Sequence, residues 1–236
     1  MEAIMILVTG ASRGIGKSIC ENLLQNGQRV IGTYCNTKPN TLYSHENLEW
    51  KHLDSENPIS VNKLLEEIHT SKTEISFLVN NAGIAQKKDI LQISEEDWQK
   101  IFRIHFFTPV QLLVELTRQN NLKRAINIVS VSAFSGGKQQ PHYAAAKAAM
   151  CNYTKSFAHV TSKTGVIVNA IAPGLVDTDM LAALNTDVCH QDITKDIPVA
   201  RLGTVEDIAS IVKYLLINDG GYINGQVITV NGGTHV

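Results

Sequence analysis

Short runs of apolar, β-branched residues alternate with longer segments of helical pattern along the whole chain of 236 residues. Several of these runs lack the polar alternation of a strand with one exposed face, so we expect both of their faces to be covered. Strands that alternate with helices in this way predict a parallel sheet with helices on both faces. No repeat or linker divides the sequence, which therefore predicts a single α/β domain over residues 1–236.

The same pattern gives the bounds of the elements. Strands are predicted at 4–8, 29–34, 48–52, 75–80, 125–129, 166–171 and 226–230. Helices are predicted at 14–25, 58–70, 95–119, 141–162 and 205–217. Ser94 and Thr204 each precede an aspartate by three positions, which predicts a weak capping box at two helix starts. The polar segment 177–198 lies outside the pattern and is either a lid over a substrate or a solvated connection.

Composition excludes several classes of function. Lys plus Arg is 21 and Asp plus Glu is 22, a net charge of −1, so we expect no binding to nucleic acid. No stretch approaches the roughly 20 apolar residues of a membrane span. The isolated cysteines Cys20, Cys35, Cys151 and Cys189 form no Cys-x-x-Cys motif, as is typical of reduced thiols. We therefore expect a cytoplasmic protein without a metal site.

A glycine-rich turn joins the first predicted strand to the first helix. Gly10 allows a tight turn, whereas Gly14 and Gly16 allow close approach of the backbone and close packing of the helix. The free N–H groups and the positive dipole at the helix N-terminus suit a pyrophosphate. This strand–turn–helix context predicts a dinucleotide site. The candidate contacts in the turn are Gly10, Ser12, Arg13, Gly14, Ile15 and Gly16.

The residues after the second strand bear on the choice between NAD and NADP. An aspartate there accepts hydrogen bonds from the ribose 2′-hydroxyl of NAD, but this chain has Tyr34-Cys35-Asn36-Thr37-Lys38. Arg13 and Lys38 are candidates to meet a 2′-phosphate, and Asn36 is a further candidate contact. We therefore expect NADP, as NADPH, in preference to NAD. The alternative for Lys38 is an exposed loop lysine.

Tyr143 and Lys147 lie four positions apart in a predicted helix and therefore share one face. They belong to a set of motifs spread over nearly the whole chain: Thr9-Gly-Ala-Ser-Arg-Gly-Ile-Gly16, Asn80-Asn-Ala-Gly83, Ser130, Tyr143-Ala-Ala-Ala-Lys147 and Asn169-Ala-Ile-Ala-Pro-Gly174. With these motifs in this order, the chain resembles the short-chain dehydrogenase/reductase family. The resemblance implies a Rossmann-like, doubly wound sheet of about seven parallel strands, with cofactor and active site at the strands' carboxyl ends.

The resemblance also implies roles for the motif residues. Tyr143 is expected to be the general acid in carbonyl reduction. Lys147, together with the positive charge of the oxidised nicotinamide, is expected to lower the pKa of the phenol, and Lys147 is also expected to contact the nicotinamide ribose. Ser130 is expected to donate to the substrate oxygen, a role that the spacing favours over Ser132. The further cofactor contacts implied are Asp54 at the adenine, Asn81, Ala82 and Gly83 at the adenosine ribose, and Pro173, Gly174, Val176 and Thr178 at the nicotinamide. The alternative for Asn81 and Asn169 is that they tie backbone segments together.

One position departs from the family's pattern. Seven residues after Trp98 the family has a catalytic asparagine, and this chain has His105. Three alternatives stay open: His105 is a working substitute in the proton relay, it weakens or shifts the relay, or the protein binds nucleotide without useful turnover. Pro109, just downstream, predicts an irregular helix.

The motifs are most similar to those of the β-ketoacyl-acyl-carrier-protein reductase branch. This similarity implies NADPH-dependent reduction of a 3-oxoacyl thioester, bound to a carrier protein or CoA, and a homotetramer packed through 95–119 and 141–162. The alternatives are a dehydrogenase of a small alcohol, sugar or sterol, and a nucleotide-binding protein with impaired catalysis. Candidate carrier-protein contacts are Lys123, Arg124 and Lys163, and candidate pocket residues are Phe134, Gln140 and Leu175.

Overall fold

The fold is a single seven-stranded sheet of parallel strands in the order β3-β2-β1-β4-β5-β6-β7. It is seen in a computed structural model that describes residues 4–37, 41–184, 194–218 and 220–235. The strands are β1 (Met5–Val8), β2 (Arg29–Tyr34), β3 (Leu48–His52), β4 (Phe77–Asn80), β5 (Arg124–Ile128), β6 (Ile167–Pro173) and β7 (Val227–Val230). The strand order reverses between β1 and β4, which is where doubly wound sheets bind their ligands.

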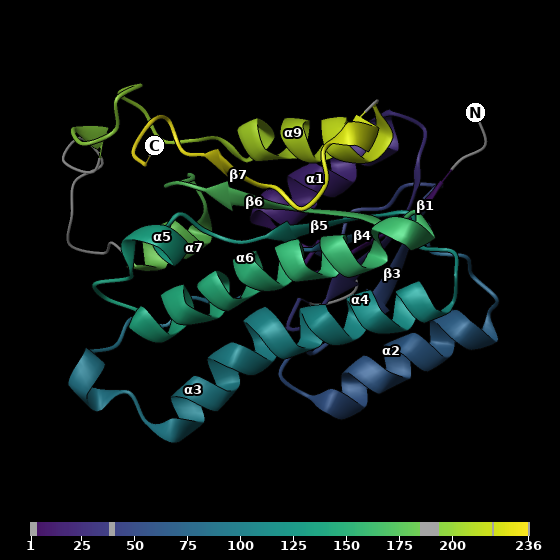
Figure 1. The fold of residues 1–236 in the computed structure, drawn as a ribbon, viewed down its shortest axis with the longest axis horizontal. Helices are drawn as coiled ribbons and strands as arrows, with labels where there is room; N and C mark the ends of the chain where they lie inside the picture. Colours follow the sequence, from purple (N-terminus) through teal and green to yellow (C-terminus); the bar gives the residue numbers. More distant parts are fainter. Residues whose placement is uncertain (1–3, 38–40, 185–193, 219, 236) are drawn as a thin grey trace.

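Helices cover both faces of the sheet (Figure 1). They are α1 (Gly14–Gln25), α2 (Pro58–Thr70), α3 (Glu95–Phe102), α4 (Thr108–Arg118), α5 (Ser132–Ser135), α6 (Pro141–Thr161), α7 (Asp179–Leu184) and α9 (Val205–Ile217). One buried cluster joins the sheet to α2, α4 and α6, and the other joins it to α1 and α9. The single α/β domain architecture and the Rossmann-like sheet are therefore confirmed. Among the described residues, no helix is long and apolar enough to cross a bilayer.

The predicted strands lie within two residues of the observed ones, and both predicted capping boxes are present. The single helix predicted over 95–119 is wrong, because a π-helical turn (Arg103–Phe107) separates α3 from α4. Pro109 has no N–H to donate to the carbonyl of His105 four residues earlier, so the regular hydrogen-bond ladder cannot continue through this point. The irregularity predicted at Pro109 is confirmed, and it places His105 in the π-helical turn.

Parallel register brings distant segments to one edge. Val8 pairs with Val79, and Asn80 pairs with Asn127, so β1, β4 and β5 end close together. The glycine turn follows β1, the segment with Asn81 follows β4, and Ser130 follows β5. The short helices α5 and α7 lie at this same edge of the sheet (Figure 1). The motifs that follow these strands are therefore gathered at their carboxyl ends.

Candidate active site

One cavity of about 750 Å³ opens at the carboxyl ends of the strands, which is within the size range of small-molecule sites. It runs from the glycine turn, past the ends of β4 and β5, to Tyr143 on α6 and Met180 on α7. All of the predicted catalytic and cofactor-contacting residues within the described part of the chain line this cavity. Lys38 lies outside the described residues. The sequence motifs therefore converge on one site.

Glycine is required where the turn approaches its neighbours. Gly10 has φ of +64°, and a Cβ there would lie 2.7 Å from the Cα of Ala82. A Cβ at Gly16 would lie 2.2 Å from the carbonyl oxygen of Gly10. The turn is thus pressed against both the start of α1 and the segment after β4, and a side chain at either glycine would push it open. Its geometry fits the pyrophosphate of a dinucleotide at the N-terminus of α1.

Two asparagines of the family motifs tie backbone segments together, as the alternative for them predicted. Asn81 donates through Nδ2 to the carbonyl oxygens of Thr9 and Gly10 at 3.0 and 3.1 Å. Asn169 donates to the carbonyl of Ile223 at 2.7 Å and accepts from the backbone N–H of Gln226 at 2.9 Å. Asn81 therefore fixes the shape of the glycine turn in addition to lining the cavity.

The end of the cavity at which the adenosine is expected carries hydroxyl, amide and guanidinium groups. The Thr37 hydroxyl donates to the Ser12 hydroxyl at 3.0 Å, joining the end of β2 to the glycine turn. Arg13 and Asn36 are exposed beside them, and no acid lies between Tyr34 and Thr37. Asp54 follows β3, and its Oδ1 accepts the backbone N–H of Glu56 at 3.0 Å. This end therefore offers donors to an anion, with Asp54 one strand further along the edge.

Ser130 is oriented by Ser132. The oxygen of Ser130 accepts both the backbone N–H of Ser132 at 3.2 Å and its hydroxyl at 2.9 Å. Because both contacts use the lone pairs of Ser130, its own proton is free to point to a substrate oxygen or to Tyr143. The orienting role of Ser132 was missed by sequence reasoning, although the Ser-x-Ser spacing was its signal.

The free protein keeps the phenol of Tyr143 protonated. Burial raises its pKa to about 12, and an interaction with the Ser130 side chain acts in the opposite direction. Burial and the Ser130 side chain account for this shift, so the lowering of the pKa by Lys147 together with the positive charge of the oxidised nicotinamide stays a prediction for the cofactor-bound protein. A protonated phenol at neutral pH is the state that a general acid requires.

Lys147 is buried and held by the end of β5. Its Nζ donates to the carbonyl of Ile128 at 2.7 Å and lies 5.6 Å from the ring centroid of Tyr143. Burial lowers the pKa of Lys147 to about 8, so it exchanges its proton near neutral pH. One of its three N–H groups serves Ile128, which leaves two for a ligand or a water.

His105 lies beside Tyr143 and is buried. Its Nε2 lies 2.9 Å from the carbonyl oxygen of Ile84, and the backbone N–H of Ile84 points at the same Nε2 at 3.3 Å. The two contacts call for opposite tautomers, and the shorter one favours Nε2 as the donor, which leaves Nδ1 as an acceptor; Nδ1 has no hydrogen-bond partner among the described residues. Burial, and secondarily the charge of Lys147, hold the pKa of His105 well below its ordinary value. His105 is therefore neutral near pH 7.

The segment after β6, which is expected to contact the nicotinamide, forms one wall of the cavity. A Cβ at Gly14 would lie 3.7 Å from Thr178 Cγ2, so this segment faces the glycine turn across the cavity. Leu175 and Gln140 line the cavity as expected, but Phe134 does not; its ring stacks on His235 at 5.2 Å. Of the predicted lid at 177–198, residues 179–184 form α7 at the cavity wall, and 185–193 lie outside the described residues.

The predicted carrier-protein contacts lie at the other edge of the sheet. Arg124 begins β5, whose far end leads to Ser130, and its guanidinium binds the carbonyls of Leu216 and Asn218 at 2.7 and 2.9 Å. Lys123 precedes this strand, and Lys163 follows the C-terminus of α6. A five-residue strand is about 17 Å long. These residues therefore cannot border the cavity, and that prediction is wrong.

Comparison with known proteins finds relatives over the whole chain. The family model described as enoyl-(acyl carrier protein) reductase matches residues 10–235. The 3-oxoacyl-[acyl-carrier-protein] reductase of Salmonella typhimurium is 36% identical over 241 residues, covering 100% of this chain and 98% of the relative. The reductases of the same name from Escherichia coli and Aquifex aeolicus are 35% and 36% identical, covering 100% and 96% of this chain and 98% and 95% of the relatives.

Solved structures share the fold at similar length. A short chain dehydrogenase family protein from Francisella tularensis has a TM-score of 0.89 at 28% identity, covering 98% of both chains. A metagenomic blue fluorescent protein in complex with NADPH has a TM-score of 0.86 at 26% identity, covering 99% of this chain and 98% of the other. A 4-hydroxyisoleucine dehydrogenase complexed with NADH has a TM-score of 0.91 at 24% identity, covering 98% of both, and bears on the fold alone.

Proposed function

We propose that this chain uses NADPH to reduce the 3-oxo group of an acyl thioester to a 3-hydroxyl group. The proposal starts from the finding that the chain belongs to the short-chain dehydrogenase/reductase family. As a member of that family, the chain is an oxidoreductase acting on the CH–OH/C=O group. The observation that carries the proposal is the convergence of Ser130, Tyr143 and Lys147 on one cavity that continues to the glycine turn. The identity of 35–36% to 3-oxoacyl-[acyl-carrier-protein] reductases supports the substrate class.

The chain's own residues supply the proton and hold the carbonyl. The glycine turn and the segment after β6 would hold the cofactor, which would supply a hydride for the carbonyl carbon. Ser130, whose oxygen is already engaged by Ser132, donates its proton in a hydrogen bond to the carbonyl oxygen as negative charge develops there. Tyr143 transfers its phenolic proton to that oxygen, completing the alcohol, and is left as phenolate. Lys147 then returns a proton toward Tyr143, for which a pKa of about 8 is well matched.

We further propose that His105 is a working part of the proton path. A neutral imidazole with a fixed Nε2–H and a free Nδ1 can accept a hydrogen bond from a water that also contacts Lys147. The neutral state supports this reading over the alternatives in which His105 weakens the relay, because a buried cation would repel Lys147. His105 would then hold the water by a side-chain nitrogen.

The preference for NADPH rests on the adenosine end of the cavity. Exposed Arg13 and Asn36 flank the Ser12–Thr37 hydroxyl pair, and no acid follows β2 within the described residues there. A 2′-phosphate would gain from Arg13 and meet no negative charge on this segment. Lys38 remains a candidate contact by its position in the sequence.

The proposal also covers the oligomeric state of the protein and its cellular compartment. We propose a homotetramer packed through 95–119, which holds α3 and α4, and through α6, which packs against α3 and the π-helical turn that leads into α4 (Figure 1). Phe107, at the junction with α4, is 46% exposed and supports burial in such an interface. Sedimentation of the pure protein measures the assembly. The free thiols of Cys20, Cys35 and Cys151 fit a reducing cytoplasm.

The test of the proposed function is consumption of NADPH by the pure protein with acetoacetyl-CoA and with a longer 3-oxoacyl thioester, across pH. Turnover with either thioester that is lost in Tyr143→Phe supports the proposal. Turnover only in the oxidative direction with alcohols would instead identify a dehydrogenase. Tight NADPH binding without turnover on any thioester, restored by His105→Asn, would mean that the natural chain is a nucleotide-binding protein.

A further inference from the structure

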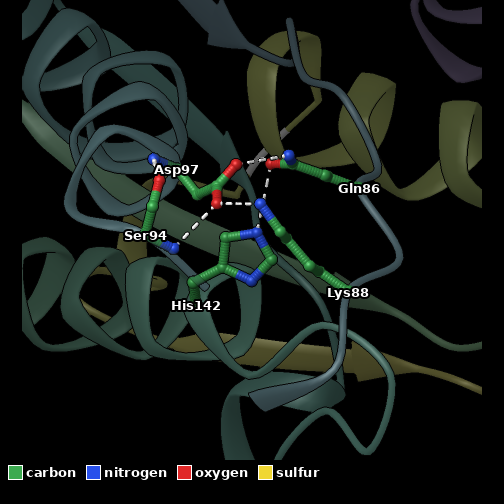
Figure 2. A network of polar contacts seen from close by, with 5 residues as sticks. All are labelled: Gln86, Lys88, Ser94, Asp97 and His142. Carbon is green, nitrogen blue, oxygen red and sulfur yellow. Dashed lines mark hydrogen bonds and ion pairs between the residues drawn. The ribbon is translucent and has the colours of Figure 1, made fainter. Parts of the chain in front are cut away.

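A cluster of five polar side chains, none of which lines the cavity, includes a residue of the first turn of α6 (Figure 2). Gln86 and Lys88 come from the connection between β4 and α3, residues 81–94, which we call the β4–α3 connection. Ser94 and Asp97 come from the start of α3, and His142 comes from α6. The cluster therefore joins three segments that are distant in the sequence.

Asp97 is the centre of the cluster. Its Oδ1 accepts Gln86 Nε2 at 2.7 Å, and its Oδ2 accepts the backbone N–H of Ser94 at 2.8 Å. The ammonium of Lys88 forms an ion pair with the same carboxylate. These donors, Lys88 first among them, hold the pKa of Asp97 far below its ordinary value. The carboxylate is therefore charged at any working pH and can only accept hydrogen bonds.

This charge fixes the orientation of Gln86 and, through it, of His142. Since Asp97 can only accept, the amide nitrogen of Gln86 must face it, and the amide oxygen then faces His142 Nε2 at 3.2 Å. His142 must accordingly donate from Nε2. Burial lowers the pKa of His142, so its ring is neutral and carries its single proton on Nε2. The ring of Trp98 packs edge-on against it at 6.0 Å.

The cluster is joined to the catalytic residues at both ends of the β4–α3 connection. His142 immediately precedes Tyr143 on α6, and the backbone N–H of Lys88 donates to the carbonyl of Gln139 at 2.8 Å, just before that helix. At its other end the connection meets His105 through Ile84, and Ile84 lines the cavity. One stretch of chain thus spans from His105 to the residue before Tyr143.

We propose that Gln86 and Asp97 are positioning residues: they clamp the β4–α3 connection to the first turn of α6 and thereby set Tyr143 against His105 and the substrate carbonyl. The inference rests on the proposed function, because it assumes that Tyr143 is the proton donor. Neither residue touches the cavity, since neither lines it. The glycine turn lies on the other side of the cavity. We therefore expect loss of the clamp to lower the rate of the chemical step and to leave the affinity for the cofactor unchanged.

Gln86→Met tests the clamp, because methionine keeps the length of the side chain and makes neither hydrogen bond. We expect kcat with NADPH and acetoacetyl-CoA to fall about tenfold, since small misplacements of reacting groups are costly. The Kd of NADPH, measured by fluorescence titration of the protein without thioester, should change less than about twofold. In ¹⁵N NMR of the free protein, the His142 ring should change from a pure Nε2–H tautomer to a mixture.

Asp97→Asn and Asp207→Asn form a matched pair. Asp207 likewise forms a capping box with Thr204 and an ion pair with Arg201. Unlike Asp97, it has no glutamine among its partners that connects it to α6. Both variants should lower Tm by similar amounts, and only Asp97→Asn should lower kcat. Equal losses of kcat in the two variants, or an unchanged His142 tautomer in Gln86→Met, would overturn the inference. A wild-type protein that reduces no thioester would overturn the proposed function instead, and the NMR result in the free protein would still decide whether the clamp exists.

Discussion

The imidazole of His105 meets the ring of Tyr143 edge to face, with ring centroids 4.9 Å apart and planes at 85°. His105 reaches this position from the π-helical turn before Pro109, and Tyr143 reaches it from the first turn of α6. The His105 ring also lies close to Gly83, where a Cβ would be 2.6 Å from His105 Cε1. A histidine fits here because the chain has a glycine opposite it, and its neutrality follows from complete burial.

Tyr143→Phe should lower kcat for thioester reduction by a factor on the order of 10² to 10⁴, because the reaction loses its proton donor. The Kd of NADPH should stay near that of the wild type, since the aromatic ring remains. Tyr153→Phe is the control: burial also raises the pKa of Tyr153, but its ring packs on Phe106 outside the cavity. Equal losses in the two variants would contradict the role of Tyr143.

His105→Leu should lower kcat about tenfold, because leucine keeps bulk beside Tyr143 and removes both ring nitrogens. His105→Asn retains a donor and an acceptor and should keep more activity than His105→Leu. Initial rates at saturating NADPH measure the difference. Full activity in His105→Leu would show that Nδ1 takes no part in proton transfer.

The outline of this site could be predicted because its signals are local. The glycine turn lies between a strand and a helix, and Tyr143 and Lys147 lie one helical turn apart, so short stretches of sequence contain the geometry. Pro109 predicted the break in the helix for the same reason.

The failed prediction for Arg124 and the unpredicted role of Gln86 have a common cause. Both depend on how segments that are distant in the sequence pack together. The sequence suggests Arg124 as a contact for a carrier protein, yet as the first residue of a parallel strand it lies at the edge opposite the cavity. The Gln86–His142 contact joins residues 56 positions apart, and only the packing of α3 against α6 creates it. The raised pKa of Tyr143 likewise reflects burial, which motif spacing does not measure.

Lys147 should make the stability of the fold depend on pH. Burial lowers its pKa from 10.5 to about 8, so between those values the unfolded chain binds more protons than the folded chain. Stability therefore rises as pH increases from about 8 to 10.5, by an amount on the order of 3 kcal/mol, and the full cost of burying the charge is present below pH 8. Urea unfolding of the wild type and Lys147→Met at pH 7.5 and 9.5 measures this, because other groups cancel in the difference. A difference that does not change with pH would contradict the lowered pKa.

Asn36→Asp should change the cofactor preference. A carboxylate at this exposed position after β2 repels a 2′-phosphate and can accept from a 2′-hydroxyl. We expect the Kd of NADPH to rise on the order of tenfold while the Kd of NADH stays the same or falls. Fluorescence titration with both cofactors measures this, and Asn36→Gln serves as the uncharged control. An unchanged ratio of the two affinities would place the 2′-phosphate away from Asn36.

Gly83→Ala should destabilise the fold through His105 in particular. The new methyl group would lie 2.6 Å from His105 Cε1, so the ring must move away from Tyr143 or the segment after β4 must shift. Overpacking of this kind costs about 1–3 kcal/mol. The smaller side chain in His105→Asn removes the clash, so the double variant should regain much of the stability lost by Gly83→Ala. A double-mutant cycle of unfolding free energies measures the coupling between the two positions. Additive losses would mean that Gly83 is required for backbone reasons, and that the fit between this glycine and His105 does not determine the choice of residue at either position.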